Sequence, residues 1–124
     1  MPRVRFDVEV EASESLARSR FVEAADNPAM VVAWFTSAES VRAEVKEREE
    51  NTWTLRVNGP GFAASGTAGV ANPGLSSGST IGIDINVSPK GLLGGAAVLA
   101  AVATGQLETE IKKALWKEFG KPHG

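Results

Sequence analysis

The chain contains no cysteine and one histidine among its 124 residues, and these two scarcities exclude several kinds of chemistry. Without cysteine there is no disulfide, no thiolate nucleophile and no cysteine-ligated metal. The histidine, His123, is the penultimate residue, and chain ends are usually disordered, which argues against a catalytic role for it. A metal site would then need carboxylates, and these alternate with basic residues as on solvated faces. We therefore expect no metal and no other cofactor.

The chain also lacks an excess of positive charge and a long apolar run. Its 13 basic and 15 acidic residues give a formal net charge of −2, which argues against nucleic acid as a partner. The N-terminus has no apolar stretch of signal-peptide length, so we expect a cytoplasmic location. The uncharged stretch at residues 91–107 is rich in glycine and alanine and shorter than the roughly 20 apolar residues that cross a bilayer. We expect no membrane span.

The chain is rich in one pattern, a helical one over residues 90–120. Its second half places an apolar face, from Leu107 to Phe119, opposite charged residues. Continued backwards, this face carries mostly small side chains: Leu93, Ala96, Ala97, Ala100, Ala101 and Thr104. A long helix that does not fill the space beneath it favours an apolar ligand cavity over a polar catalytic cleft. Gly105 makes a bend in this helix plausible because glycine weakens a helix interior.

Alternation of apolar and polar residues predicts five strands, which span residues 4–10, 41–46, 53–57, 62–70 and 79–87. Two short helices are expected after the first strand. Ser13 and Ser15 are candidate N-caps of the first helix, and Pro28 can occupy the first turn of the second. Turn-forming residues between the later strands predict an antiparallel meander.

This order of elements resembles the START-like superfamily, also called SRPBCC or the polyketide cyclase/dehydrase and lipid transport superfamily. The matching segments are RFDVEVEAS before a helix, DNP with Trp34 after it, and VSPKGLLGG before the last helix. The resemblance covers one domain, residues 1–120, followed by a flexible tail at 121–124, with five strands where the family typically has seven. It implies an α+β fold in which a curved antiparallel sheet wraps around a long C-terminal helix, the helix-grip arrangement. It also implies a pocket between them for a lipid, sterol, polyketide or other aromatic ligand.

Eight residues, all apolar except Thr104, face this pocket in the expected arrangement and form the candidate site. They are Trp34, Trp53, Ile83, Ile85, Leu93, Ala97, Ala101 and Thr104. Asp84 lies between two isoleucines, where a carboxylate could serve as a buried general base, but strand parity places it on the opposite face of its strand. Trp116 falls outside the core face of the helix, with Val98, Leu99 and Val102, in a strip that another element or a second subunit is expected to cover.

These features favour a binding or carrier protein for a hydrophobic small molecule. A polyketide cyclase or dehydratase of the same fold is the second hypothesis, and it requires ionisable groups in the pocket, of which the sequence offers few. A third is an interaction module whose apolar helix face forms a homodimer or binds another protein.

Overall fold

The structure, a computed structural model, describes residues 3–35, 41–59, 61–72, 78–89, 100 and 103–122, with the backbone alone at 33–35. Five antiparallel strands form one open sheet in the order β1-β5-β4-β3-β2. The strands are β1 (Arg3–Val10), β2 (Arg42–Glu49), β3 (Thr52–Gly59), β4 (Phe62–Ala71) and β5 (Ser79–Pro89). The helices are α1 (Glu14–Asp26), α2 (Ala29–Phe35) and α4 (Gln106–Phe119). The expected α+β class, the five strands and their antiparallel pairing are confirmed.

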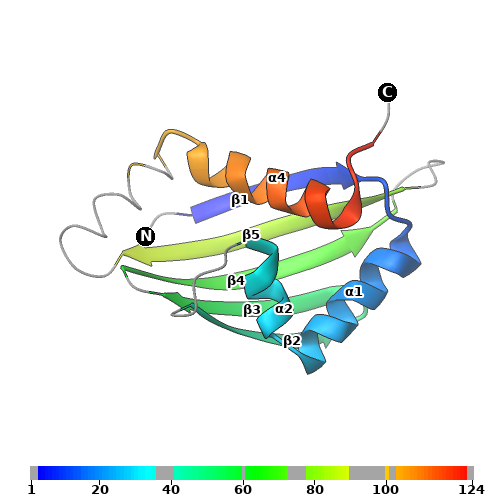
Figure 1. Ribbon diagram of the computed structural model, residues 1–124, viewed down its shortest axis with the longest axis horizontal. Helices are drawn as coiled ribbons and strands as arrows, with labels where there is room; N and C mark the ends of the chain where they lie inside the picture. The colour runs from blue at the N-terminus through cyan, green and yellow to red at the C-terminus, as the bar shows by residue number, and fades with distance from the viewer. Residues whose placement is uncertain are drawn as a thin grey trace.

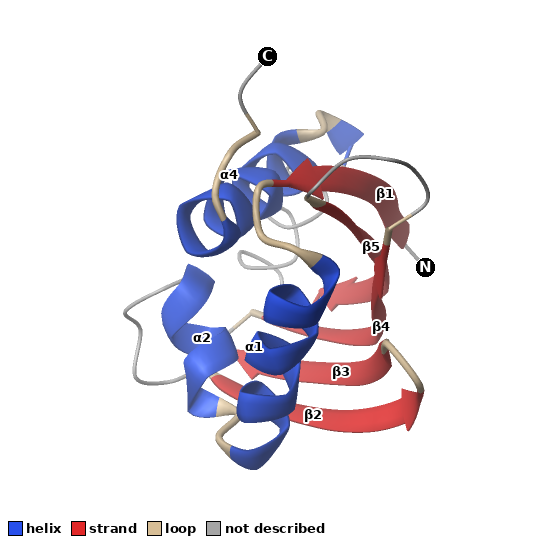
Figure 2. Cartoon of the chain, turned by 90° about the vertical axis from the view of Figure 1, so that its right-hand side faces the viewer, coloured by secondary structure: helices blue, strands red, loops and turns tan. Residues whose placement is uncertain are grey.

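All three helices lie against one face of the sheet, which we call the inner face (Figures 1 and 2). α4 lies against β1 at one end of the sheet, whereas α1 contacts β2 and β4 nearer the other end. None of the described helices lies on the opposite, outer face (Figure 2). The sheet is therefore covered on one side, in agreement with the alternation of buried and exposed residues along β1.

The two short helices begin and end at residues that the sequence marks. The backbone N–H of Leu16 donates to Ser13 Oγ at 3.2 Å, so Ser13 is the N-cap of α1. The N–H of Asn27 donates to the carbonyl of Glu23 at 2.9 Å at the end of that helix. Pro28 has no N–H and precedes α2, where the first-turn donors need no helical partner.

A stack of three aromatic rings joins the sheet to two helices. The ring of Phe21 in α1 lies 4.9 Å from Trp53 in β3 and 5.7 Å from Phe119 in α4, measured between centroids. The interplanar angles are 20° and 13°, and all three side chains are buried. Offset stacking of this kind adds to the free energy gained by burying the rings. The stack forms the centre of the core.

The C-terminal helix is shorter than the sequence predicts. Gly105 adopts a left-handed conformation, with φ of 75°, immediately before α4 begins. A left-handed residue cannot continue a right-handed helix, so the single helix expected over residues 90–120 is wrong at this point. From Gln106 onward the prediction holds, because Ile111, Leu115 and Phe119 are buried on one face. None of the described helices is long and apolar enough to cross a membrane.

The end of α4 is fastened to the segment between β1 and α1. The N–H groups of Glu11 and Ala12 donate to the carbonyls of Gly120 and Phe119 at 2.9 and 3.0 Å. The carbonyl of Ala12 also accepts a hydrogen bond from the buried hydroxyl of Ser79, at 2.7 Å. These bonds hold α4 against β1 and fix where its apolar face meets the sheet.

Candidate functional site

The inner face of the sheet divides into a tightly packed part and a half-buried part. Trp53 and Ala68, directly opposite each other on β3 and β4, are 0% exposed, and Ile83, which pairs with Ala68 on β5, is 5% exposed. One step along the same strands, five apolar residues are only half-buried. We call this group the inner patch: Leu55, Val57, Ala64, Gly66 and Ile85. The helices therefore do not seal the inner face evenly.

Strand register brings the five residues of the inner patch together. Gly66 lies between Leu55 and Ile85 on the neighbouring strands, and Ala64 pairs with Val57. Because Ala64 and Gly66 on β4 have small side chains or none, the surface of the patch is lower there than at the larger residues on either side. A Cβ on Gly66 would collide with the carbonyl of Asp84 and the backbone of Ile85, so this position requires glycine. The patch is a shallow apolar surface that contains no ionisable side chain.

The structure places four of the eight predicted cavity residues. Trp53 and Ile83 are buried, and Trp53 is occupied by its stack with Phe21. Ile85 belongs to the inner patch. Thr104 is exposed, and its hydroxyl donates to the carbonyl of Ala100 at 2.8 Å. The Trp34 side chain, Leu93, Ala97 and Ala101 lie outside the described residues, as do His123 and the strip residues Val98, Leu99 and Val102.

Four residues of the inner patch were missed by the sequence analysis. Leu55 and Val57 alternate with polar residues on β3, so their side of the strand was known but not their exposure. Ala64 and Gly66 lie on a strand rich in small residues, where hydropathy gives a weak signal. Their importance follows from register, which joins residues far apart in the chain.

Two buried polar atoms have no hydrogen-bond partner among the described residues: the indole nitrogen Nε1 of Trp53 and Oδ1 of Asn51. Asn51 adopts a left-handed conformation in the β2–β3 turn, with φ of 63°, and its Nδ2 donates to Glu14 Oε1 at 2.7 Å. An unpaired buried donor costs about 1–3 kcal/mol. The Trp53 N–H is therefore a place where a water or a polar ligand atom would gain a hydrogen bond.

The outer face is polar and holds Asp84. Asp84 accepts two hydrogen bonds from Arg3, at 2.8 Å from Nε and 2.6 Å from Nη2. The hydrogen bond from Arg3 holds the pKa of Asp84 below its ordinary value, and the charges of Arg3 and Arg5 act in the same direction. A carboxylate held ionised on an open face is unsuited to act as a general base, so the outward orientation expected from parity is confirmed.

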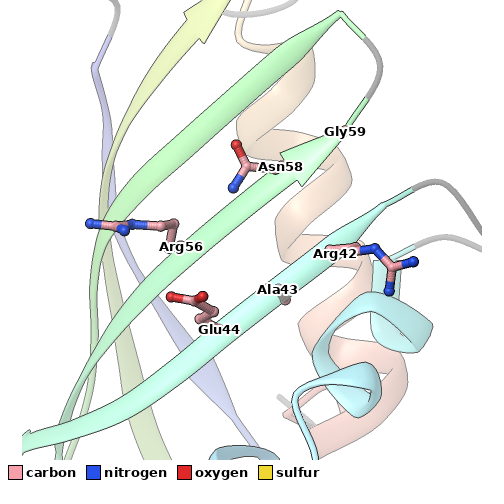
Figure 3. Close-up of a pocket in the computed structure, with 6 residues that line it drawn as sticks. All are labelled: Arg42, Ala43, Glu44, Arg56, Asn58 and Gly59. Carbon is pink, nitrogen blue, oxygen red and sulfur yellow. The ribbon is translucent and has the colours of Figure 1, made fainter.

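A shallow hollow of about 390 Å³ lies at the β2 edge of the sheet, lined by Arg42, Ala43, Glu44, Arg56, Asn58 and Gly59. Figure 3 shows that Arg42 and Arg56 point away from each other and that Glu44 lies on the side of Arg56. The two guanidinium groups therefore do not converge on one anion. No group of three or more potential metal ligands occurs within the described ranges of the chain.

A second hollow of about 320 Å³ lies between the free edge of β1 and α4. We call it the β1 groove; its lining residues are Asp7, Val8, Glu9, Lys112, Trp116, Lys121 and Pro122. Trp116 is half-buried there, and its Nε1 donates to the carbonyl of Glu9 at 2.8 Å. Lys121 Nζ lies 5.0 Å from the centre of the Trp116 ring, so Trp116 contacts β1 and the segment after α4.

Comparison with known proteins gives a fold and no family. No protein-family model and no curated protein matches the chain. The solved structure of XoxI from Bacillus cereus aligns over 96% of this chain and 96% of its own, with a TM-score of 0.56 and 15% identity. DynU16, a protein of the dynemicin biosynthetic locus, aligns over 98% of this chain and 49% of its own, with a TM-score of 0.49 and 22% identity. The XoxI alignment shows a shared fold, and membership of the START-like superfamily stays a prediction.

Proposed function

We propose that this protein binds a hydrophobic small molecule over the inner patch. The observation that carries the proposal is the half-buried state of five neighbouring apolar residues on the inner face, beside the fully packed Trp53 and Ala68. Binding sites for small molecules are mostly apolar surfaces with few polar groups, and the patch has this composition. An apolar ligand would remove the remaining exposed area from water.

The stretch that precedes α4 would form the opposite wall in this proposal. The side chains that the sequence pattern is expected to turn toward the sheet there are those of Leu93, Ala97 and Ala101. Small residues on both walls, with Ala64 and Gly66 opposite, would leave the volume that a ligand needs. The unpaired N–H of Trp53, two positions before Leu55 on the same face of β3, would suit a ligand with a polar atom at one end.

Binding is favoured over catalysis because the patch offers no acid, base or nucleophile. The nearest carboxylate in sequence, Asp84, belongs to the outer face and is paired with Arg3. Acid–base catalysis needs an ionisable side chain within hydrogen-bond reach of the substrate. A carrier or sequestering protein needs only the apolar surface.

Two alanines on β4 provide the test. Ala64 belongs to the half-buried inner patch. Ala68 lies on the same face of the same strand, two residues beyond Gly66, and is 0% exposed. Ala64→Phe should fill vacant space, so affinity for the neutral apolar fluorophore N-phenyl-1-naphthylamine falls about tenfold or more while thermal stability is kept. Ala68→Phe should overpack the core and lower stability by about 1–3 kcal/mol.

Two results would contradict the proposal. If Ala64→Phe destabilises the protein as much as Ala68→Phe does, no free space lies over the patch. If the Ala64→Phe variant binds the fluorophore with unchanged affinity, the fluorophore binds elsewhere.

A further inference from the structure

Among the described strands, the two at the ends of the sheet, β1 and β2, have a neighbour on one side only. Free edges tend to pair with other chains, and proteins usually block them with bulges or charges. β2 is blocked in this way, because its register shifts between Glu47 and Glu49 and its side chains from Lys46 to Glu49 are exposed. β1 has no such interruption, since all eight of its residues pair with β5 in one continuous register.

The sequence of β1 is complementary to itself when two copies run antiparallel. Its outer face carries two basic and then two acidic residues, Arg3, Arg5, Asp7 and Glu9, all exposed. Aligned about Phe6, Arg5 of one copy lies opposite Asp7 of the other, and Arg3 lies opposite Glu9. The two-fold symmetry makes each of these opposite-charge pairs twice. On the inner face the same alignment places Val4 opposite Val8.

We propose that β1 pairs with β1 of a second copy of this chain, which joins two five-stranded sheets edge to edge. Opposite charges directly across an antiparallel pair stabilise it, and like charges destabilise it. Any shift of register by two residues would place Arg5 opposite Arg5 or Asp7 opposite Asp7. The charge pattern therefore selects one register as well as one partner.

The backbone of β1 is oriented for this pairing. The carbonyl of Glu9 accepts its hydrogen bond from Trp116, so it points away from β5 and toward the free edge. Backbone groups alternate in direction along a strand, so those of Arg5 and Asp7 point to the same edge. Arg5 of one copy and Asp7 of the other would then exchange two backbone hydrogen bonds. The two-fold symmetry makes this pair twice.

The edge of β1 is accessible along this segment. The β1 groove is lined by Asp7 and Glu9 together with Lys112 and Trp116 of α4, so the helix leaves a hollow along this edge. The Trp116 indole already occupies the Glu9 carbonyl, and Arg3 is bonded to Asp84. The ends of the paired segment are thus partly engaged within one subunit. Recognition rests on Arg5 and Asp7 at the centre.

Charge reversal with rescue tests the proposal by sedimentation equilibrium or light-scattering mass. The unmodified protein should dimerise reversibly with concentration. D7R should weaken the dimer by about tenfold or more, because symmetry converts two attractive pairs into repulsive ones. R5E should do the same, and the double variant R5E/D7R should restore dimerisation. K46E, on the exposed β2 edge, is the matched control and should leave the dimer unchanged.

Circular dichroism of each variant shows whether a lost dimer reflects lost pairing or an unfolded monomer. Arg5 lies opposite Asp84 in the sheet of its own subunit, so R5E can weaken the monomer, whereas Asp7 lies opposite Gly82 and D7R does not create that repulsion. A folded D7R monomer beside a dimeric double variant supports the proposal. A monomeric wild-type protein up to its solubility limit, or a dimer that D7R leaves intact, overturns it.

Discussion

The ion pair between Arg3 and Asp84 makes a pH-dependent contribution on the outer face. Arg3 lowers the pKa of Asp84 from its ordinary value of 3.8, chiefly through the side-chain hydrogen bond. A carboxyl whose folded pKa is depressed contributes stability above its unfolded pKa, and this stability is lost as the pH falls through the folded pKa. The contribution is small because both side chains are substantially exposed, at 53% and 34%.

Asp84→Asn should therefore be slightly less stable than the wild type at pH 7, and the difference should vanish at pH values well below 3.8. Urea denaturation of both proteins across this range measures the gap. Thr67→Ser, a neutral change on the neighbouring strand opposite Asp84, is the control and should show a gap independent of pH. A gap between wild type and Asp84→Asn that widens on acidification would contradict the account.

Single residues were predictable where local rules decide. The Ser13 cap and the outward side of Asp84 follow from capping preference and strand parity, and both are confirmed. The role of Trp116 was not predictable in this way. Its indole donates to the carbonyl of Glu9, which is 107 positions away in the chain, so the partner exists only once α4 has packed on β1.

Gly105 decides where α4 starts. With φ of 75° it is left-handed, and a Cβ at this position would meet no atom within 4 Å. A substitution is therefore penalised through the backbone alone. Gly105→Ala should lower the free energy of unfolding by about 1–2 kcal/mol, and Gly105→Asn by less, because asparagine tolerates this conformation better.

The sign of this change in stability shows whether α4 begins after a left-handed Gly105 or whether one continuous helix runs through that residue. In the interior of one continuous helix, Gly105→Ala would stabilise by about 1 kcal/mol. Thermal or urea unfolding of the alanine and asparagine variants measures it. A stabilised alanine variant would contradict the left-handed conformation of Gly105 and favour a helix that runs through it.

At the scale of elements, the sequence predicts type and order better than bounds. Period-two and helical patterns located all five strands and all three described helices. The patterns failed at Gly105 because periodicity reports which face a residue lies on and is silent about its φ. The turn at Asn51 shows the same limit, since the alternation predicted at residues 41–46 does not reveal that β2 continues to Glu49 or that Asn51 has φ of 63°.

For the whole molecule, the question is how the helices share the inner face. The aromatic stack of Trp53, Phe21 and Phe119 fills one part of the core, and the inner patch remains half-buried beside it. The sequence correctly assigned Trp53, Ile83 and Ile85 to the inner face. It did not show that Trp53 packs on a helix while Ile85 belongs to the half-buried inner patch, because that division depends on where α1 and α4 cross the sheet.

The central claim is that an apolar ligand binds over the inner patch, and methyl NMR of the 13.0 kDa protein tests it most directly. On titration with N-phenyl-1-naphthylamine, we expect saturable chemical-shift changes at the methyl groups of Leu55, Val57, Ala64 and Ile85. The packed residues Val10, Val70 and Ile81 should change little, since they are buried and already in contact with protein atoms. Changes confined to the packed residues or to the β1 groove, or no change at saturating fluorophore, would contradict the claim.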